Sequence, residues 1–121
     1  MKERVLKIKS LKFAVRIVNL YKFLCEDKKE FIISKQVLRS GTSVGAMVRE
    51  AEHSESTADL AHKLAIAQKE INETLYRLEL LKETEYISTK EFESIHADAV
   101  ELIKIITASV KTIKTKLIPN P

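Results

Sequence analysis

Cysteine, proline and glycine are scarce in this sequence, and each scarcity excludes a class of structure. Of its 121 residues only two are glycine and two are proline, and both prolines, Pro119 and Pro121, lie at the C-terminus. Because a many-stranded sheet needs the turn residues that are missing here, we expect an all-α fold. The single Cys25 can form neither an intramolecular disulfide nor a thiolate metal cage, which favours a reducing compartment.

Long apolar runs are missing as well. Lys12 and Arg16 interrupt each apolar stretch near the N-terminus that could serve as a membrane-targeting core. We therefore expect a cytoplasmic protein with no membrane partner. The chain is 45% hydrophobic and 31% charged, which together with its length fits one folded domain over residues 1–121.

What is present in quantity is helical periodicity. Apolar stripes predict four helices, at about residues 3–27, 35–53, 57–84 and 89–117. Ser34 is the expected N-cap of the second helix, and Ser56 with Asp59 and Ser88 with Glu91 are capping-box signals before the third and fourth. Because the connections are short, an antiparallel up-down-up-down four-helix bundle is predicted.

The first two helices carry signals of close packing and assembly. When Ile8, Leu11 and Val15 are included, the apolar arc of the first helix covers roughly two thirds of its circumference, more than a surface helix needs. One face should therefore meet a partner outside the bundle or cover an unusually broad core. Small residues in the second helix let another helix approach closely. The candidate packing and assembly residues are Phe13, Ile17, Leu20, Tyr21, Leu24, Gly41, Ser43 and Gly45.

Two patterns resemble nucleophilic sites. Residues 41–45 read Gly-Thr-Ser-Val-Gly, which matches the G-x-S-x-G nucleophile elbow. That motif needs a preceding strand and a strained turn, whereas here it lies within a helical repeat. Cys25 and His96 belong to the same end of the predicted bundle and could form a nucleophilic pair. Since Cys25 continues a core stripe, a small buried hydrophobe is the simpler interpretation.

Metal chemistry is the other enzymatic alternative. Glu50-x-x-His53 and Glu93-x-x-His96 match the Glu-x-x-His motif of di-metal bundles. The second and fourth helices run parallel in the predicted topology, so these pairs should lie roughly 25 to 30 Å apart, too far for a shared metal. The residues of a possible mononuclear site are Glu50, His53, Asp59 and His62. Solvated polar residues at a helix junction explain that cluster more simply, so we expect no enzyme, metal or cofactor.

The charge pattern points to a different class of function. The net charge is +4, and cations dominate both the opening half of the first helix and the chain after Glu101. These segments should meet at one end of the bundle, and four cations of the first helix project within about 80° of each other, as a stripe along a phosphate backbone would. The candidate nucleic-acid-binding residues are Lys2, Lys9, Lys12, Arg16, Lys111, Lys114 and Lys116. A solvated charged face is the alternative, and the three tyrosines offer no evident stacking platform.

Several segments carry a family resemblance. Residues 13–21 read FAVRIVNLY, residues 36–46 read QVLRSGTSVGA and residues 49–51 read REA, with further agreement along residues 59–81. The chain resembles the 23S ribosomal RNA intervening-sequence protein family over nearly its whole length, most specifically in the Arg39–Ser43 run. One departure is Arg77, where relatives often place tryptophan, so the local packing there should differ.

The resemblance implies a four-helix bundle that assembles as a barrel-like homopentamer. Some members are encoded in sequences that interrupt bacterial ribosomal RNA genes. A related branch, the accessory variability determinant of diversity-generating retroelements, is a basic pentamer that binds nucleic acid and a reverse transcriptase. The implied function is a non-enzymatic, homo-oligomeric accessory protein that binds RNA or DNA through a basic surface. The alternative is a scaffold that binds a partner protein, and neither reading assigns a role to Arg39, Glu50, Glu70 or Tyr76.

Overall fold

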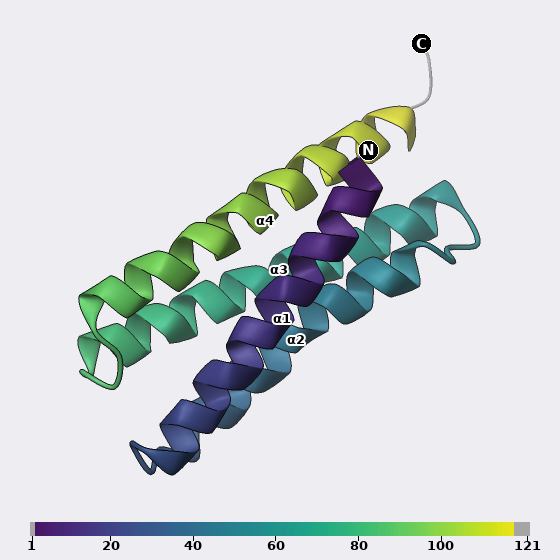
Figure 1. The fold of residues 1–121 in the computed structure, drawn as a ribbon. Helices are drawn as coiled ribbons and strands as arrows, with labels where there is room; N and C mark the ends of the chain where they lie inside the picture. Colours follow the sequence, from purple (N-terminus) through teal and green to yellow (C-terminus); the bar gives the residue numbers. More distant parts are fainter. Residues whose placement is uncertain (1, 118–121) are drawn as a thin grey trace.

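The computed structural model describes the backbone of residues 2–117 and the side chains from Arg4 onwards. All regular secondary structure in this range is α-helical, which confirms the predicted all-α class. The four helices are α1 (Lys2–Glu26), α2 (Ile33–Ala51), α3 (Thr57–Glu83) and α4 (Thr89–Leu117). Figure 1 shows them gathered into one bundle with short connections.

Each helix packs against two others: α1 and α3 both contact α2 and α4. Between α1 and α2, Lys7 lies 3.5 Å from Glu52 and Cys25 lies 3.8 Å from Ser34, so residue numbers rise along one helix as they fall along the other. The contact between α1 and α4 is the least extensive of these four helix–helix contacts. In Figure 1 these two helices diverge towards the C-terminal end of α1.

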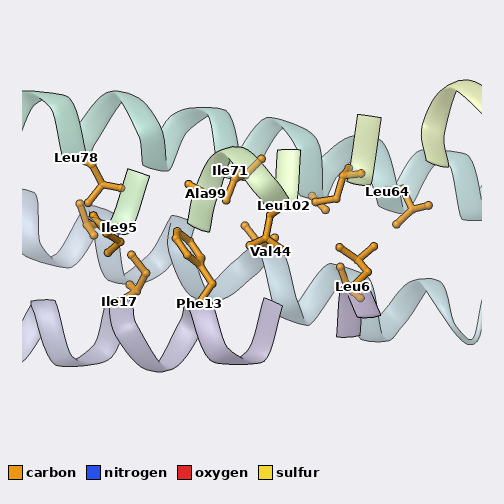
Figure 2. Packing of buried hydrophobic residues seen from close by; sticks show 14 of the residues in the cluster. Leu6, Phe13, Ile17, Val44, Leu64, Ile71, Leu78, Ile95, Ala99 and Leu102 are labelled. Carbon is orange, nitrogen blue, oxygen red and sulfur yellow. The ribbon is translucent and has the colours of Figure 1, made fainter. Parts of the chain in front are cut away.

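A single continuous core runs along the inside of the bundle (Figure 2). Phe13, Ile17 and Leu24 of α1 are at most 1% exposed. They face Val44 of α2 and aliphatic side chains of α3 and α4, all fully or nearly buried. Burying a large apolar side chain contributes about 1.5 to 3 kcal/mol relative to leaving it in water, so this core is the main source of stability.

The starts of α3 and α4 follow the predicted capping signals. The backbone N–H of Asp59 donates to Ser56 Oγ at 3.0 Å before α3. At α4 the box is reciprocal: the N–H of Glu91 donates to Ser88 Oγ, and the N–H of Ser88 donates to Glu91 Oε1, both at 3.1 Å. These contacts satisfy backbone donors that a helix leaves unpaired in its first turn. They confirm the capping box at α4 and the Ser56 cap at α3, where the Asp59 carboxylate accepts the N–H of Glu55 and not that of Ser56.

The start of α2 was predicted wrongly. Ser34 is not the N-cap but a fully buried residue of the first turn, and the helix begins at Ile33 rather than at about residue 35. Glu30 does the capping instead. Its carboxylate accepts the N–H of Ser34 at 2.7 Å and those of Ile33 and Ile32 at 3.1 and 3.2 Å. The end also differs, since the helix stops at Ala51 and residues 52–54 continue with i to i−3 backbone bonds.

These three N–H groups set the ionisation of Glu30. Burial on its own would raise the pKa of this carboxyl, but the backbone donors of Ser34, Ile33 and Ile32 and the Ser34 hydroxyl outweigh burial, so the pKa is lowered. A depressed pKa means that the folded state favours the ionised form. The stabilisation is therefore complete above the pKa of the unfolded chain and is lost as the pH falls through the folded value.

Glu30→Gln is expected to lower the free energy of unfolding by about 1 to 2 kcal/mol at pH 7, because a charged cap becomes a neutral one. The gap to the parent protein should shrink as the pH falls from the unfolded-state pKa of a glutamate, about 4.3, through the lowered folded pKa of Glu30. Urea unfolding at pH 7 and pH 3 measures both gaps. Glu26→Gln, at an exposed residue one turn earlier, is the matched control; an equal gap at both pH values would contradict the capping role.

Candidate nucleic-acid interface

The cations that were predicted to form a basic stripe on α1 lie partly against α4. Arg16 Nη1 donates to Asp98 Oδ2 at 2.8 Å and to the Ser94 carbonyl oxygen at 3.2 Å, and its Nη2 donates to Ser94 Oγ at 3.0 Å. Lys9 forms an ion pair with Glu101 one turn further along α4. Both cations thus join the two helices, and each has a carboxylate beside it that offsets its attraction for phosphate.

The other predicted cations stay free of such partners. Lys12, Lys111, Lys114 and Lys116 are exposed, and none of them forms an ion pair within residues 4–117. Lys2 belongs to α1, but its side chain lies outside the described residues. The candidate nucleic-acid interface therefore contains fewer unpaired cations than the basic stripe predicted from the sequence.

The α4 lysines do not adjoin Lys12. Lys9 pairs with Glu101, and Lys111 lies ten residues beyond Glu101, or about 15 Å along the axis of α4. At about 100° per residue, Lys111 and Lys114 share a side of α4, whereas Lys116 points some 140 to 160° away from them. The structure therefore separates the predicted set into the cations of α1, the pair Lys111 and Lys114 on one side of α4, and Lys116 on another side of α4.

The predicted assembly residues lie mainly inside the chain. Phe13, Ile17 and Leu24 are core residues, and Leu20 packs partly against the core. Tyr21 is half-buried, and a hydrogen bond with the Cys25 thiol raises the pKa of its phenol. Side chains already enclosed by their own bundle cannot also contact a second copy.

Gly41 and Gly45 bring α2 against α1. A Cβ added at Gly41 would lie 2.7 and 2.8 Å from Cγ1 and Cγ2 of Ile17, which is closer than carbon atoms can pack. At Gly45 the nearest atom would be the Ser10 carbonyl oxygen at 3.4 Å. Ser43 instead donates to the Arg39 carbonyl oxygen at 2.6 Å within α2. Residues 41–45 are thus continuous helix, and no strand or sharp turn precedes the serine.

A different part of α1 is exposed and apolar. Val5, Ile8, Leu11 and Val15 are 38%, 46%, 51% and 52% exposed. Their spacing of three, three and four residues places them along the face of α1 that points away from the core. We call these four residues the α1 stripe. The only sequence signal for it is the unusually wide apolar arc of the first helix.

A groove opens where α1 and α4 diverge. It encloses about 500 Å³ and is lined by the second half of α1, the first turns of α4 and Ile87. Arg16 and Ser94, which hydrogen bond across the seam, both line it. Sequence reasoning missed this groove, because the divergence of two helices leaves no periodic signal.

The predicted catalytic and metal-ligating residues do not gather into a site. Cys25 contacts Ser34, whereas His96 stacks on Phe92 with ring centroids 5.0 Å apart. Glu50 and His53 lie at the C-terminal end of α2, with Glu93 in the second turn of α4. Within the part of the chain that the structure describes, no three His, Cys, Asp or Glu residues are grouped closely enough to hold a metal ion.

Comparison with known proteins gives the family. The family model described as 23S rRNA-intervening sequence protein matches residues 3–108. The chain belongs to this family. It is also similar to a protein of unknown function from the S23 ribosomal protein family of Bacteroides thetaiotaomicron VPI-5482, with 58% identity and a TM-score of 0.91 over 92% of this chain and 99% of that one. A search of curated proteins finds no significant match.

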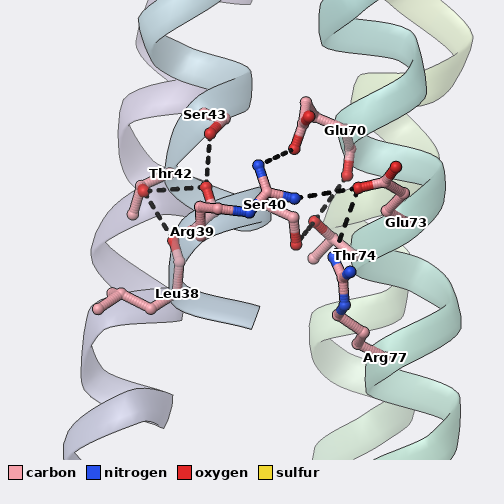
Figure 3. Close-up of polar contacts among 9 residues, drawn as sticks. All are labelled: Leu38, Arg39, Ser40, Thr42, Ser43, Glu70, Glu73, Thr74 and Arg77. Atoms are coloured by element: carbon pink, nitrogen blue, oxygen red, sulfur yellow. Dashed lines mark hydrogen bonds and ion pairs between the residues drawn. The ribbon is translucent and has the colours of Figure 1, made fainter. Parts of the chain in front are cut away.

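In this member of the 23S rRNA-intervening sequence protein family, Arg39 and Ser40 form polar contacts with α3, whereas Thr42 and Ser43 donate to carbonyl oxygens of α2 (Figure 3). Arg39 bridges two carboxylates, with Nη1 3.2 Å from Glu70 and Nη2 3.2 Å from Glu73. Arg77 Nη1 also lies 3.5 Å from Glu73. The Glu70 side chain is only 11% exposed, so Arg39 is the counterion of a largely buried charge.

Beside this cluster, Thr74 donates to Ser40 Oγ at 2.8 Å, and both residues are fully buried. Arg77 joins the same polar network through Glu73. Arg39 and Ser40 thus serve the α2–α3 contact, whereas Gly41 packs against Ile17 of α1. Among residues 2–117, no helix is long and apolar enough to cross a membrane.

Proposed function

We propose that this chain acts as a non-enzymatic, homo-oligomeric accessory protein that binds RNA through its unpaired lysines. The observation that carries the proposal is that Lys12, Lys111, Lys114 and Lys116 are exposed and form no ion pair with a carboxylate of residues 4–117. Unpaired surface cations attract phosphate at long range and release its counterions on contact. The family description, which names 23S rRNA, favours RNA over other polyanions.

The proposal includes an assembled state, an antiparallel up-down-up-down bundle repeated as a homopentamer. It is supported by the α1 stripe, four aliphatic side chains that their own bundle leaves exposed. A contiguous apolar face of this kind marks a contact with another protein surface. In a ring of five copies each unpaired lysine occurs five times, which multiplies a net charge of only +4 per chain.

Changing Lys12, Lys111 and Lys114 to glutamine is expected to weaken RNA binding and to reduce its salt dependence. If each of the three lysines contacts one phosphate of a single strand, the slope of log affinity against log salt should fall by about 2. Fluorescence anisotropy of a labelled RNA between about 50 and 200 mM salt measures that slope. The bundle itself should be unaffected, because none of the three lysines forms an ion pair with another described residue.

The matched control changes Lys22, Lys35 and Lys69 to glutamine, since these are also exposed and unpaired among the described residues. It removes the same three charges from other faces. If it weakens binding as much as the first variant, only net charge matters and the proposed surface is wrong. RNA binding that does not respond to salt would also contradict the proposal.

A second candidate function is a scaffold that binds a partner protein. Tyr76 favours it, because this residue is 66% exposed on α3 and tyrosine is enriched in protein interfaces. The test is a pull-down after nuclease treatment with the parent protein and with Tyr76→Ala. A protein retained by the parent alone, with no RNA present, would support the scaffold over the RNA-binding function.

A further inference from the structure

The groove between α1 and α4 begins where the predicted basic stripe ends. Lys12, Arg16, Asn19 and Phe23 are spaced four, three and four residues apart, so they follow one face of α1. Arg16, Asn19 and Phe23 line the groove. A strand whose phosphate lies at Lys12 would therefore reach the groove within three turns of α1.

The groove combines an apolar floor with a polar rim. Leu20, Phe23 and Ile95 form apolar parts of its lining, and Ile95 is nearly buried. Asn19 and Ser94 also line it, and they offer an amide and a hydroxyl group. These groups can donate to and accept from the edge of a nucleobase. Ser94 Oγ accepts a bond from Arg16, which leaves its own hydrogen free to donate.

The groove has cations on both sides and one carboxylate in its lining. Lys90, on its α4 side, is exposed and forms no ion pair within residues 4–117, and Lys12 stands outside it along α1. Lys28 Nζ lies 5.8 Å from the centre of the Phe23 ring, and the carboxylate among the lining residues is Glu91. The volume of about 500 Å³ lies within the common range for small-molecule sites. Single-stranded nucleic acids are commonly bound by aromatic side chains that stack on bases, together with nearby cations that contact the backbone.

We propose that this groove binds one unstacked base of a single-stranded RNA, with Phe23 as its stacking surface. Asn19 and Ser94 hydrogen bond to the edge of the base, and Lys12 and Lys90 contact the flanking phosphates. The inference rests on the proposed RNA-binding function and adds a preference to it. Because a duplex keeps its bases stacked, only a single strand can use the groove.

The experiment compares a short uridine-rich RNA strand, labelled with fluorescein, alone and annealed to its complement. Phe23→Leu keeps an apolar side chain but removes the ring, so single-strand affinity should fall about tenfold. Duplex affinity should stay unchanged. Phe31→Leu is the matched control, since Phe31 is 52% exposed on the α1–α2 connection and does not line the groove; it should change neither affinity.

Two further readouts separate stacking from a structural effect of the substitution. Phe23→Tyr retains the ring and should restore single-strand binding. Photo-crosslinking with 5-iodouridine RNA should attach the base to the α1 segment that contains Asn19 and Phe23. Crosslinks confined to the end of α4, or a Phe23→Leu protein that binds the single strand as the parent does, would overturn the groove proposal.

The outcomes also distinguish this inference from the function on which it rests. Salt-dependent binding of single strand and duplex with equal affinity, unaffected by Phe23→Leu, would leave the RNA-binding proposal standing and remove the groove. A parent protein that binds neither RNA at about 50 mM salt would overturn both. Circular dichroism of each variant verifies that the helices are intact.

Discussion

Changing both Ile8 and Val15 to glutamate is expected to convert the proposed assembly into monomers of 13.8 kDa. These side chains are 46% and 52% exposed and belong to the α1 stripe, so a second copy that covers the stripe would bury two new charges per chain. Interface centres exclude charged residues, because a desolvated charge without a partner is very costly. Light scattering coupled to size-exclusion chromatography measures the mass before and after the change.

The fold should survive this change. Both positions point away from the core, and both side chains are solvent-exposed in the single chain. The matched control changes Ile32 and Tyr76 to glutamate, because these residues are 73% and 66% exposed outside the stripe. It adds the same charge and should leave the assembled mass unchanged. A parent protein that already elutes at 13.8 kDa would refute the assembly proposal.

Gly41→Val is expected to lower the free energy of unfolding by about 3 kcal/mol. Even a single Cβ would come within 2.8 Å of two carbon atoms of Ile17, which is fully buried and branched at Cβ, so it cannot swing aside. Overfilling a packed core typically costs about 1 to 3 kcal/mol, and the valine adds two further methyl groups at the tightest point. Thermal and urea unfolding measure the loss.

Gly45→Ala is the matched comparison in the same helix. Its new Cβ would lie 3.4 Å from the Ser10 carbonyl oxygen, which is close to ordinary contact. Because alanine favours a helix over glycine by about 1 kcal/mol, this change should be neutral or stabilising. The cost of Gly41→Val should also fall when Ile17 is changed to alanine in the same chain. A Gly41→Val protein at least as stable as the parent would show that helix propensity, and not the contact with Ile17, decides the outcome.

Much of the fold could be predicted because it depends on local signals. The starts of α3 and α4 follow from hydroxyl and carboxylate residues three positions apart, whose partners are their own backbone neighbours. The start of α2 was missed for a related reason. Glu30 caps from outside the standard N-cap position, and Ser34 has the residue type of a cap but lies in the first turn. Residue type alone therefore does not locate a cap.

The candidate site was less predictable because it depends on contacts between distant segments. The positions of Lys9 and Arg16 on one face of α1 follow from periodicity, but their pairing with Glu101 and Asp98 depends on how α4 lies. The sequence did not indicate Phe23 as a stacking residue, because only the divergence of α1 from α4 exposes it to a groove. The wide apolar arc of α1 did indicate an outward apolar face, and the exposed α1 stripe provides that face.

The polar contacts between α2 and α3 have a mechanical consequence. If α2 slid one turn along α3, about 5.4 Å, Glu70 would lose its counterion and the buried Ser40 and Thr74 hydroxyls would lose each other. Only one register of α2 against α3 therefore keeps these contacts. The seam between α1 and α4 is held by exposed ion pairs, which cost little to break. The α2–α3 pair is therefore stiff, and the contact between α1 and α4 is more compliant. Any opening that admits a ligand should start between α1 and α4.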